Sequence, residues 1–389
     1  MVKLLKHQKE FIKRNPKQSI MAWGTRVGKS YAIAFWLKNY PDTDFILICP
    51  KRIKKQWQEI LKECEVVNTE VATKEEAKKI DLNKYGGLVC DEAHHISKGL
   101  YEKPSQITRT VYEWKRTHTD SPILLATATP IRSSPANLHT LATFAGIFWE
   151  WKTYRAKYYH LARRPYVPRP FWDPVKDWRI LIQQAVRNVC DIIALSDITE
   201  VPEQRHHIVK VKLFEQTEKA IKNFSDESAV KEWYGRHKLA QREEKLEKIK
   251  ELSENEAKVI VACKYREQID FYEKELKKER EVIILTGGVK DQMAAIQRAM
   301  ESLECYFIIQ TDCGEGFRGD SFSLLIFASM SWSFVAYEQM LGRMLHLEKK
   351  HSNDFYYLLA DEKDKIIYKR IMLGKDFSIA EIAKSKKAD

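Results

Sequence analysis

Short apolar runs alternate with amphipathic helical stretches in two separate parts of the sequence, and this alternation constrains the fold more than any other feature. Runs of strand length lie at residues 45–49, 87–90 and 123–126, and a second series lies at 258–262, 282–285, 306–309 and 324–327. Strands that alternate with helices build mostly parallel sheets, because each helix returns the chain to the same end of the sheet. The sequence therefore predicts an α/β protein with two parallel-sheet lobes.

A different composition lies between the two series. We expect helical protrusions there, at about 146–200 and 213–256. The second stretch is highly charged, but an apolar stripe runs along part of it, formed by Leu239, Leu246, Ile249 and Leu252. Such a stripe favours packing on a lobe over a free coiled coil.

The composition excludes several classes of protein. The 389 residues are 44% hydrophobic and 31% charged and include only 14 Gly and 12 Pro, which excludes a disordered or fibrous chain and suffices for two domains. The sequence has no run of 18 apolar residues and no secretory leader, so we expect a cytoplasmic protein without membrane contact. The seven cysteines form no C-x-x-C pair, which indicates a reducing compartment and no zinc site.

The net charge of +12 indicates a polyanionic partner. From Trp149 to Trp172, six basic residues stand against the single acid Glu150. The basic residues are Lys152, Arg155, Lys157, Arg163, Arg164 and Arg169, and they alternate with the rings of Trp151, Tyr154, Tyr158, Tyr159 and Tyr166. Two interpretations stay open: the rings stack on exposed bases while the cations bind the nucleic-acid backbone, or the rings pack a protrusion onto the first lobe and the cations face solvent.

A candidate phosphate-binding loop precedes the apolar stretch at 31–37. Its residues are Trp23, Gly24, Thr25, Arg26, Val27, Gly28, Lys29 and Ser30. Backbone N–H groups at such a helix start bind phosphate, Lys29 would contact the β- and γ-phosphates, and Ser30 would hold Mg²⁺. Trp23 stands where the full motif has its first glycine, so an ordinary helix start remains the alternative.

An acidic pair follows the apolar run at 87–90. Asp91 at the end of a strand would hold Mg²⁺ through water, and Glu92 would accept the proton of the water that attacks the γ-phosphate. An Asp-Glu pair that merely caps a helix is the alternative. Downstream, the hydroxyls of Thr127 and Thr129 would relay the state of the nucleotide site, and Arg343 on a helical segment would face phosphate.

These motifs occur in one order and resemble those of a superfamily-two helicase of the Swi/Snf-like branch. The resemblance extends over nearly the whole chain. Its segments are LKHQ ending at Gln8, LICPK at 47–51 with Trp57, DEAH at 91–94 with Lys98, LATATPIRSSPANLHTL at 125–141, residues 260–269, GEGF at 314–317 with Trp332, and the final motif with Gln339, Gly342 and Arg343.

The resemblance implies two RecA-like motor lobes with helical protrusions between them, and ATP and Mg²⁺ as cofactors. The first lobe would span 1–212, including an insertion at about 146–200, and residues 213–389 would hold the protrusion at about 213–256 and the second lobe. Gln8 would read adenine, Gly316 and Arg343 would contact the nucleotide, and Gln339, Arg343, Lys29 and Glu92 would act in catalysis. The implied DNA contacts are Lys51, Arg52, Thr127, Lys264, Thr286, Gly287 and Trp332.

The chain departs from the family pattern at two positions. Arg26 replaces a glycine of the phosphate loop, and His346 replaces the last arginine of the final motif. Three explanations of how hydrolysis continues stay open: Arg343 acts alone, protonated His346 assists, or Arg26 approaches the phosphates.

We therefore expect a DNA-dependent ATPase that translocates on double-stranded DNA. The alternatives are a helicase that separates strands, although the short spacing between Gly316 and Gln339 leaves no room for one type of wedge, and a nucleic-acid-binding module with impaired hydrolysis. A chain of this length resembles compact members encoded by bacteriophages. That resemblance suggests a role in phage DNA replication, recombination or repair in the cytoplasm of a bacterial host.

Overall fold

The computed structural model describes residues 2–101, 103–131, 134–163, 170–215, 217, 241–313, 319, 321–345 and 352–373. The chain divides into two compact units, Met1–Thr199 with Asp376–Asp389, and Glu200–Lys375. The sequence placed the first lobe's end at residue 212, whereas the structure divides the chain after Thr199. The difference arises because β9 (Gln204–Lys210) pairs with a strand of the second unit, β14 (Asn353–Leu359).

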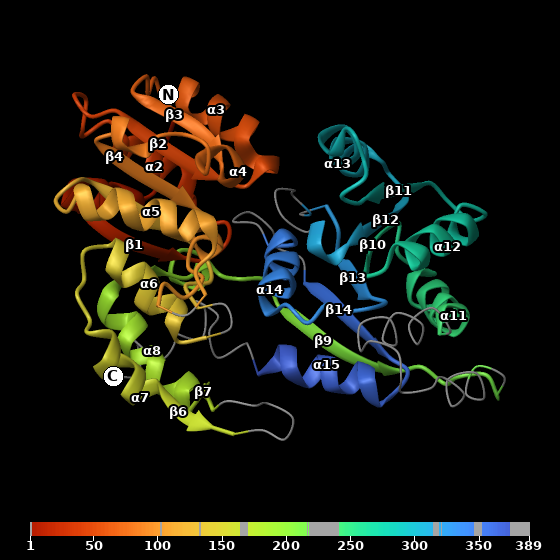
Figure 1. The fold of residues 1–389 in the computed structure, drawn as a ribbon. Helices are drawn as coiled ribbons and strands as arrows, with labels where there is room; N and C mark the ends of the chain where they lie inside the picture. The colour runs from red at the N-terminus through yellow and green to blue at the C-terminus, as the bar shows by residue number, and fades with distance from the viewer. Residues whose placement is uncertain are drawn as a thin grey trace. The chain divides into compact units, whose positions relative to one another are not determined.

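The first unit contains a six-stranded sheet in which every pairing is parallel (Figure 1). Its strand order is β3 (Thr69–Thr73), β2 (Phe45–Cys49), β4 (Gly87–Asp91), β5 (Ile123–Ala126), β1 (Gln18–Trp23) and β8 (Cys190–Ile193). β2, β4 and β5 are buried along their whole length, as expected for strands covered on both faces.

Six helices accompany the strands of this sheet: α1 (Lys6–Arg14), α2 (Lys29–Leu37), α3 (Lys54–Glu63), α4 (Lys74–Ala77), α5 (Gln106–Thr117) and α6 (Ala136–Phe144). On one face, Val111 and Trp114 of α5 pack with Leu88 of β4 and Leu125 of β5. Trp114 also donates its indole N–H to the carbonyl oxygen of Tyr85 at 3.1 Å. The apolar runs found in the sequence thus form the core.

The insertion of the first unit is only partly helical. It consists of α7 (Trp151–Tyr158), an antiparallel hairpin of β6 (Tyr159–Ala162) and β7 (Phe171–Pro174), and α8 (Trp178–Val189). The expectation of a helical protrusion over about 146–200 is wrong near its end, because residues 190–193 form β8 and pair with β1. The insertion therefore returns directly to the central sheet.

The second unit contains another six-stranded, entirely parallel sheet. Its order is β11 (Val282–Leu285), β12 (Cys305–Gln310), β10 (Lys258–Cys263), β13 (Leu324–Phe327), β14 and β9. The accompanying helices are α11 (Arg242–Ser253), α12 (Arg266–Leu276), α13 (Gln292–Glu301), α14 (Phe334–Arg343) and α15 (Glu362–Met372). Leu246 and Ile249 of α11 are buried in the core, which confirms a packed face there, whereas Leu239 lies outside the described residues.

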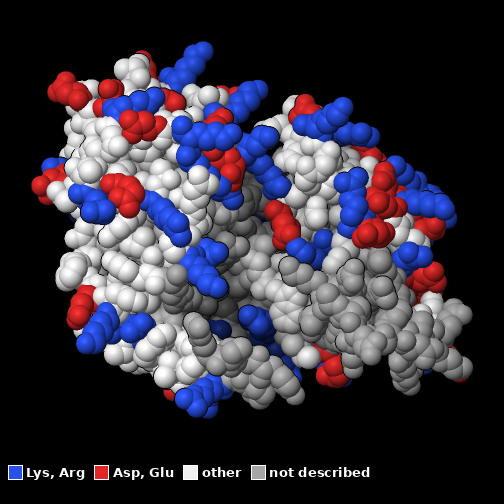
Figure 2. Space-filling model, viewed as in Figure 1, with Lys and Arg blue, Asp and Glu red and all other residues white. Residues whose placement is uncertain are grey.

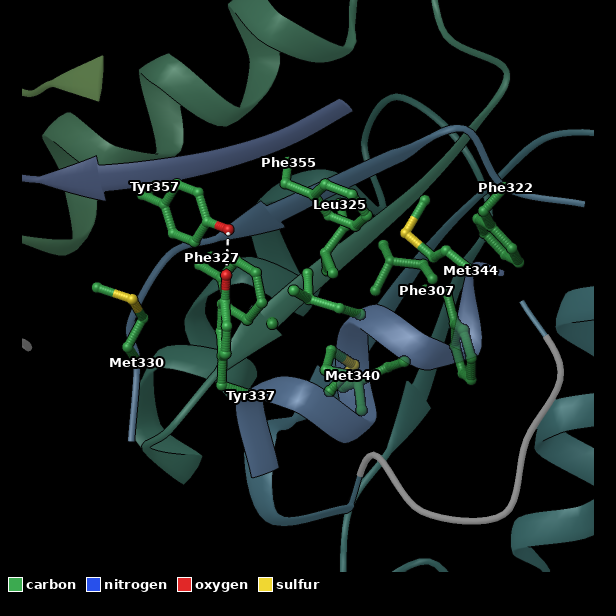
Figure 3. Close-up of a cluster of buried hydrophobic side chains, with 14 of the residues drawn as sticks. Phe307, Phe322, Leu325, Phe327, Met330, Tyr337, Met340, Met344, Phe355 and Tyr357 are labelled. Carbon is green, nitrogen blue, oxygen red and sulfur yellow. Dashed lines mark hydrogen bonds between the residues drawn. The ribbon is translucent and has the colours of Figure 1, made fainter. Parts of the chain in front are cut away.

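The core of the second unit fixes α14, the helix that carries the final motif (Figure 3). Met340 and Tyr337 of this helix pack among Phe327, Phe355 and Tyr357 of the sheet. The Tyr337 and Tyr357 hydroxyls lie 2.9 Å apart and are hydrogen-bonded, so the buried polar atoms are satisfied. Aromatic packing and this hydrogen bond together hold α14 on the sheet.

Two parallel six-stranded sheets flanked by helices confirm the predicted α/β fold with two RecA-like lobes. Within the part of the chain that the structure describes, no helix is long and apolar enough to span a bilayer.

Candidate nucleotide site

The phosphate loop connects β1 to α2 and requires unusual backbone geometry. Gly28 caps α2 with φ of 78°, and a Cβ there would lie 2.4 Å from Nε2 of Gln8. This conformation favours glycine, and any other residue here would also have to displace the amide of Gln8. Arg26 also adopts a positive φ, 64°, which costs a non-glycine residue about 1 kcal/mol or more. The arginine at the family's glycine position thus keeps the left-handed backbone that a glycine would adopt.

Trp23, which replaces the first glycine of the motif, anchors the beginning of the loop. Its buried indole donates Nε1–H to Oδ1 of Asp191 on β8 at 2.8 Å, and its ring contacts the edges of His7 and Phe11 on α1. The next residue, Gly24, donates its N–H to the carbonyl oxygen of Ile193 at 2.8 Å. The loop is therefore attached to α1 on one side and to β8 on the other.

Helix α1 supports the far end of the loop. The buried side chain of Gln8 donates Nε2–H to the carbonyl oxygen of Gly28 at 2.8 Å and accepts from the N–H of Leu5 at 2.6 Å. His7 donates to the carbonyl oxygen of Val27 at 2.8 Å. The structure thus places the predicted adenine-reading glutamine directly against the phosphate loop.

The Lys29 ammonium lies within the loop. It donates to the carbonyl oxygens of Trp23 at 3.0 Å and Gly24 at 2.8 Å. Neutral carbonyl oxygens are weaker partners for a cation than phosphate oxygens. An anion bound at this helix start would therefore compete favourably for the ammonium, with the N–H groups at the start of α2 beside it.

Asp91 ends β4 and is held in place by a buried tryptophan. Its Oδ2 accepts the indole N–H of Trp57 on α3 at 2.9 Å, and its Oδ1 accepts the N–H of Glu92 at 2.9 Å. Burial, followed by the charge of Glu92, raises the pKa of Asp91 to about 6, whereas the charge of Lys29 and the hydrogen bond from Trp57 lower it. The phosphate loop follows β1 and Asp91 ends β4, so both lie at the carboxyl edge of the same parallel sheet, with β5 between them.

The donor set fits a magnesium ion. The Asp91 carboxylate and the Ser30 hydroxyl are hard oxygen ligands, which Mg²⁺ prefers, and one or two protein ligands suffice because the ion keeps waters and takes phosphate oxygens. Across the described ranges, no group of three or more His, Cys, Asp or Glu side chains could hold a metal. The two oxygen donors thus suit an ion that keeps waters and also takes phosphate oxygens of a nucleotide.

Glu92 occupies a strained backbone position next to Asp91. Its φ is 52°, and its Oε2 lies 3.2 Å from Nδ1 of His94, a buried ring. The same Nδ1 lies 3.3 Å from the hydroxyl of Thr127 and 3.5 Å from that of Thr129. Strained residues concentrate at functional sites, where the surrounding contacts hold them.

Thr127 has no exposed surface. The structure places its hydroxyl beside His94, while a contact of Thr127 with DNA stays a prediction. This position suits a residue that relays the state of the Glu92 carboxylate through His94.

The second unit carries the remaining predicted nucleotide residues. Gln339 is buried, and its Nε2 has no hydrogen-bond partner among the residues that the structure describes. Arg343 is half-buried at the end of α14, and its carbonyl oxygen accepts the N–H of Gly319 at 2.9 Å. Gly316 and His346 lie outside the described residues.

The predicted DNA contacts of the first unit lie just after β2. Lys51 is exposed and Arg52 half-buried, in a short 3-10 helix that spans Lys51–Ile53. Both residues thus follow the carboxyl end of a strand, the same edge that carries Asp91.

The predicted contacts of the second unit differ in exposure. Gly287 is exposed with open space around it, and Trp332 is 40% exposed with the guanidinium of Arg370 5.5 Å from its ring centre. Lys264 forms an ion pair with Asp312. The Thr286 side chain is buried, and its hydroxyl accepts from Nη1 of Arg266 and from the N–H of Gly288, both at 3.3 Å. Gly287 and Trp332 are thus the most accessible of the four.

The structure of the insertion shows whether its aromatic rings are free to stack on bases or pack on the first lobe. Tyr154, Tyr158 and Tyr159 are buried, and the hydroxyl of Tyr154 donates to the carbonyl oxygen of Pro135 at 2.8 Å. Stacking on bases is therefore wrong for these three rings, and packing on the first lobe is correct. Trp151 is partly buried in the same cluster, while Arg164, Tyr166 and Arg169 lie outside the described residues.

The contact between Gly28 and Gln8 yields a stability prediction. Gly28→Ala should lower the free energy of unfolding by about 2 kcal/mol, because alanine is strained at this φ and its Cβ meets Gln8. Gln8→Ala/Gly28→Ala should lose less than the sum of the two single changes, since the first change removes the steric conflict. Urea unfolding of the three variants measures this coupling. Strict additivity would show that the Gln8 contact does not restrict position 28.

Comparison with known families agrees with the geometry of the second unit. Residues 244–347 match the helicase conserved C-terminal domain, a segment that begins in α11 and ends just beyond α14 and therefore includes Gln339 and Arg343. A search of curated proteins found no match. The matched segment and the parallel-sheet fold of both units indicate a member of the helicase superfamily.

Proposed function

We propose that this chain is a DNA-dependent ATPase that hydrolyses ATP with Mg²⁺ and translocates on double-stranded DNA, in the manner of Swi/Snf-like motors. The observation that supports it best is the grouping of Lys29, Asp91 and Glu92 at one edge of the first sheet, with Lys29 close enough to lower the pKa of Asp91. This grouping supplies a cation for phosphate, a ligand for metal and a base for water in one place. The helicase-type segment at 244–347 supports the nucleic-acid part of the proposal.

Binding of ATP would use the loop at 24–30. Its N–H groups at the start of α2 would hold the phosphates, and Lys29 would exchange the carbonyl oxygens of Trp23 and Gly24 for phosphate oxygens. Ser30 and Asp91 would hold Mg²⁺, which neutralises the charge that develops on the phosphates. Gln8 would read adenine from its position beside the loop.

Hydrolysis would use Glu92 as the base. Its carboxylate would accept a proton from the attacking water, while His94 fixes its orientation. Gln339 and Arg343 of the second unit would complete catalysis, the arginine by stabilising negative charge in the transition state. His94, Thr127 and Thr129 form a buried polar connection that would report the state of Glu92 to the rest of the unit.

The DNA backbone would contact Lys51 and Arg52 in the first unit and Lys264, Gly287 and Trp332 in the second, with Thr286 supporting the loop that presents Gly287. We further propose that this chain is encoded by a bacteriophage and acts in DNA replication, recombination or repair in the cytoplasm of the bacterial host. We propose that the two compact units, divided after Thr199, are the two motor lobes.

Nucleic-acid dependence tests the proposal. ATP turnover at low salt should rise several-fold with duplex DNA and less with single-stranded DNA or RNA, and Lys29→Ala should abolish it, because the loop would then lack its cation. Phosphate release measures each rate. Stimulation chiefly by single strands would favour a strand-separating helicase. Nucleotide binding without turnover under any condition would favour a binding module in which Arg26 and the residue at 346 impair hydrolysis.

Two buried tryptophans provide a matched test of the metal ligand. Trp57→Phe should lower turnover about tenfold to a hundredfold, since the residue that orients a metal ligand is removed while most of the packing stays. Trp114→Phe is the control, because it also removes a buried indole hydrogen bond, to Tyr85 instead of Asp91. Steady-state kinetics at saturating Mg²⁺ and thermal unfolding separate activity from stability. Equal losses of turnover in both variants would contradict the positioning role of Trp57.

A further inference from the structure

The insertion exposes a ring and an aliphatic side chain on one face of its hairpin. Leu161 on β6 and Trp172 on β7 stand directly opposite in the antiparallel register, so their side chains share a face. Leu161 is 57% exposed and Trp172 is 42% exposed, in contrast to the buried tyrosines at the base of the same insertion. Trp172 is thus one of the exposed aromatic rings of the insertion, besides Phe148 before α7, which is 89% exposed.

An arginine extends this face. The guanidinium of Arg155 on α7 lies 4.3 Å from the ring centre of Trp172, which is within the range of a cation–π contact. Guanidinium and indole are both planar, and both are groups on which unpaired nucleobases stack. A half-exposed tryptophan with an arginine at its ring is thus a platform of the kind that binds bases.

The charge around the platform favours a polyanion. Lys152 and Lys157 on α7 and Arg163 just after β6 are all exposed. The acid of the hairpin, Asp173, pairs with His160 in the register and therefore lies on the opposite face from Trp172. Figure 2 shows basic side chains in larger number than acidic ones over the end of the first unit where Figure 1 places α7 and β6.

We propose that the Leu161–Trp172 face of the hairpin, together with Arg155, binds unpaired bases of single-stranded nucleic acid, while the exposed cations contact its backbone. The proposal rests on the proposed function and adds a binding site outside the motor motifs. Unpaired bases are the expected ligand because both faces of a base inside a duplex are already covered by its neighbours. Cations around the ring favour nucleic acid over an apolar protein partner.

Helix α8 connects this site to a strand that contacts the start of the phosphate loop. Helix α8 follows the hairpin and leads into β8, whose Asp191 accepts the indole N–H of Trp23 at the start of the loop. Turnover stimulated by single strands is a second readout, because it tests whether binding at the hairpin affects the nucleotide site.

Trp172→Ala in the full chain tests the proposal. Fluorescence anisotropy with an oligothymidine and with a blunt duplex should show roughly tenfold weaker binding of the single strand and unchanged binding of the duplex, since one base stack is lost. Trp172→Phe should retain most of the affinity. Arg155→Lys should fall between, because it keeps the charge but loses the planar group.

The matched control is Ile180→Ala on α8, an exposed aliphatic residue of the same insertion that lies outside the hairpin. It should bind both nucleic acids as the wild type does. Unchanged single-strand binding by Trp172→Ala, equal losses for single strand and duplex, or an equal loss in Ile180→Ala would overturn the proposal. Absence of single-strand binding by the wild type would also overturn it.

Basal ATP turnover separates this proposal from the proposed function. Trp172→Ala should keep the basal rate, because the residue is not part of the nucleotide site. A wild-type chain that binds single strands through Trp172 but never hydrolyses ATP would refute the proposed function and leave the hairpin site standing. A chain that hydrolyses ATP with duplex DNA but loses nothing on Trp172→Ala would do the reverse.

Discussion

Parallel strand pairing is the constraint on which the rest of each unit depends. In a parallel sheet the carboxyl ends of all strands meet at one edge, and both faces must be covered by helices. The first unit uses that edge for the loop after β1, for Asp91 and Glu92 after β4, and for Thr127 after β5. Candidate catalytic and binding residues from distant parts of the sequence therefore lie at one edge of the sheet without the need for a long loop.

Buried side chains convert this arrangement into a site with defined geometry. Trp57 fixes Asp91, Trp23 ties the phosphate loop to Asp191, and His94 connects Glu92 to Thr127. Trp57, Trp23 and His94 are buried, so loss of the partner of any of these rings leaves a buried polar atom unsatisfied. The site is therefore held by tertiary contacts from α3, β8 and the chain after β5, as well as by the loop itself.

Seven strands of the two sheets and the order of the motifs could be predicted, because apolar runs and short motifs are local properties, whereas β1, β3, β8, β9 and β14 were not predicted. β8 was missed, since its four residues are only half-buried and gain their hydrogen bonds from pairing with β1. The structure divides the chain after Thr199 and not at the predicted residue 212, because β9 pairs with β14, a strand far away in the sequence. The insertion's tyrosines were ambiguous for a similar reason: their burial depends on a partner as distant as Pro135. The sequence analysis placed Trp57 in a motif. Its hydrogen bond to Asp91 could not be predicted, because this bond joins α3 to β4 only in the folded protein.

The central claim is that the edge formed by Lys29, Asp91 and Glu92 hydrolyses ATP. Its most direct test is phosphate release by the full chain with Mg²⁺ and duplex DNA, compared with the Glu92→Gln variant, together with nucleotide binding by both proteins. The account predicts a fall in turnover of at least about a hundredfold with ATP binding retained, because glutamine keeps the shape of the side chain but cannot accept the proton of the water. Turnover that is unchanged in Glu92→Gln would contradict it.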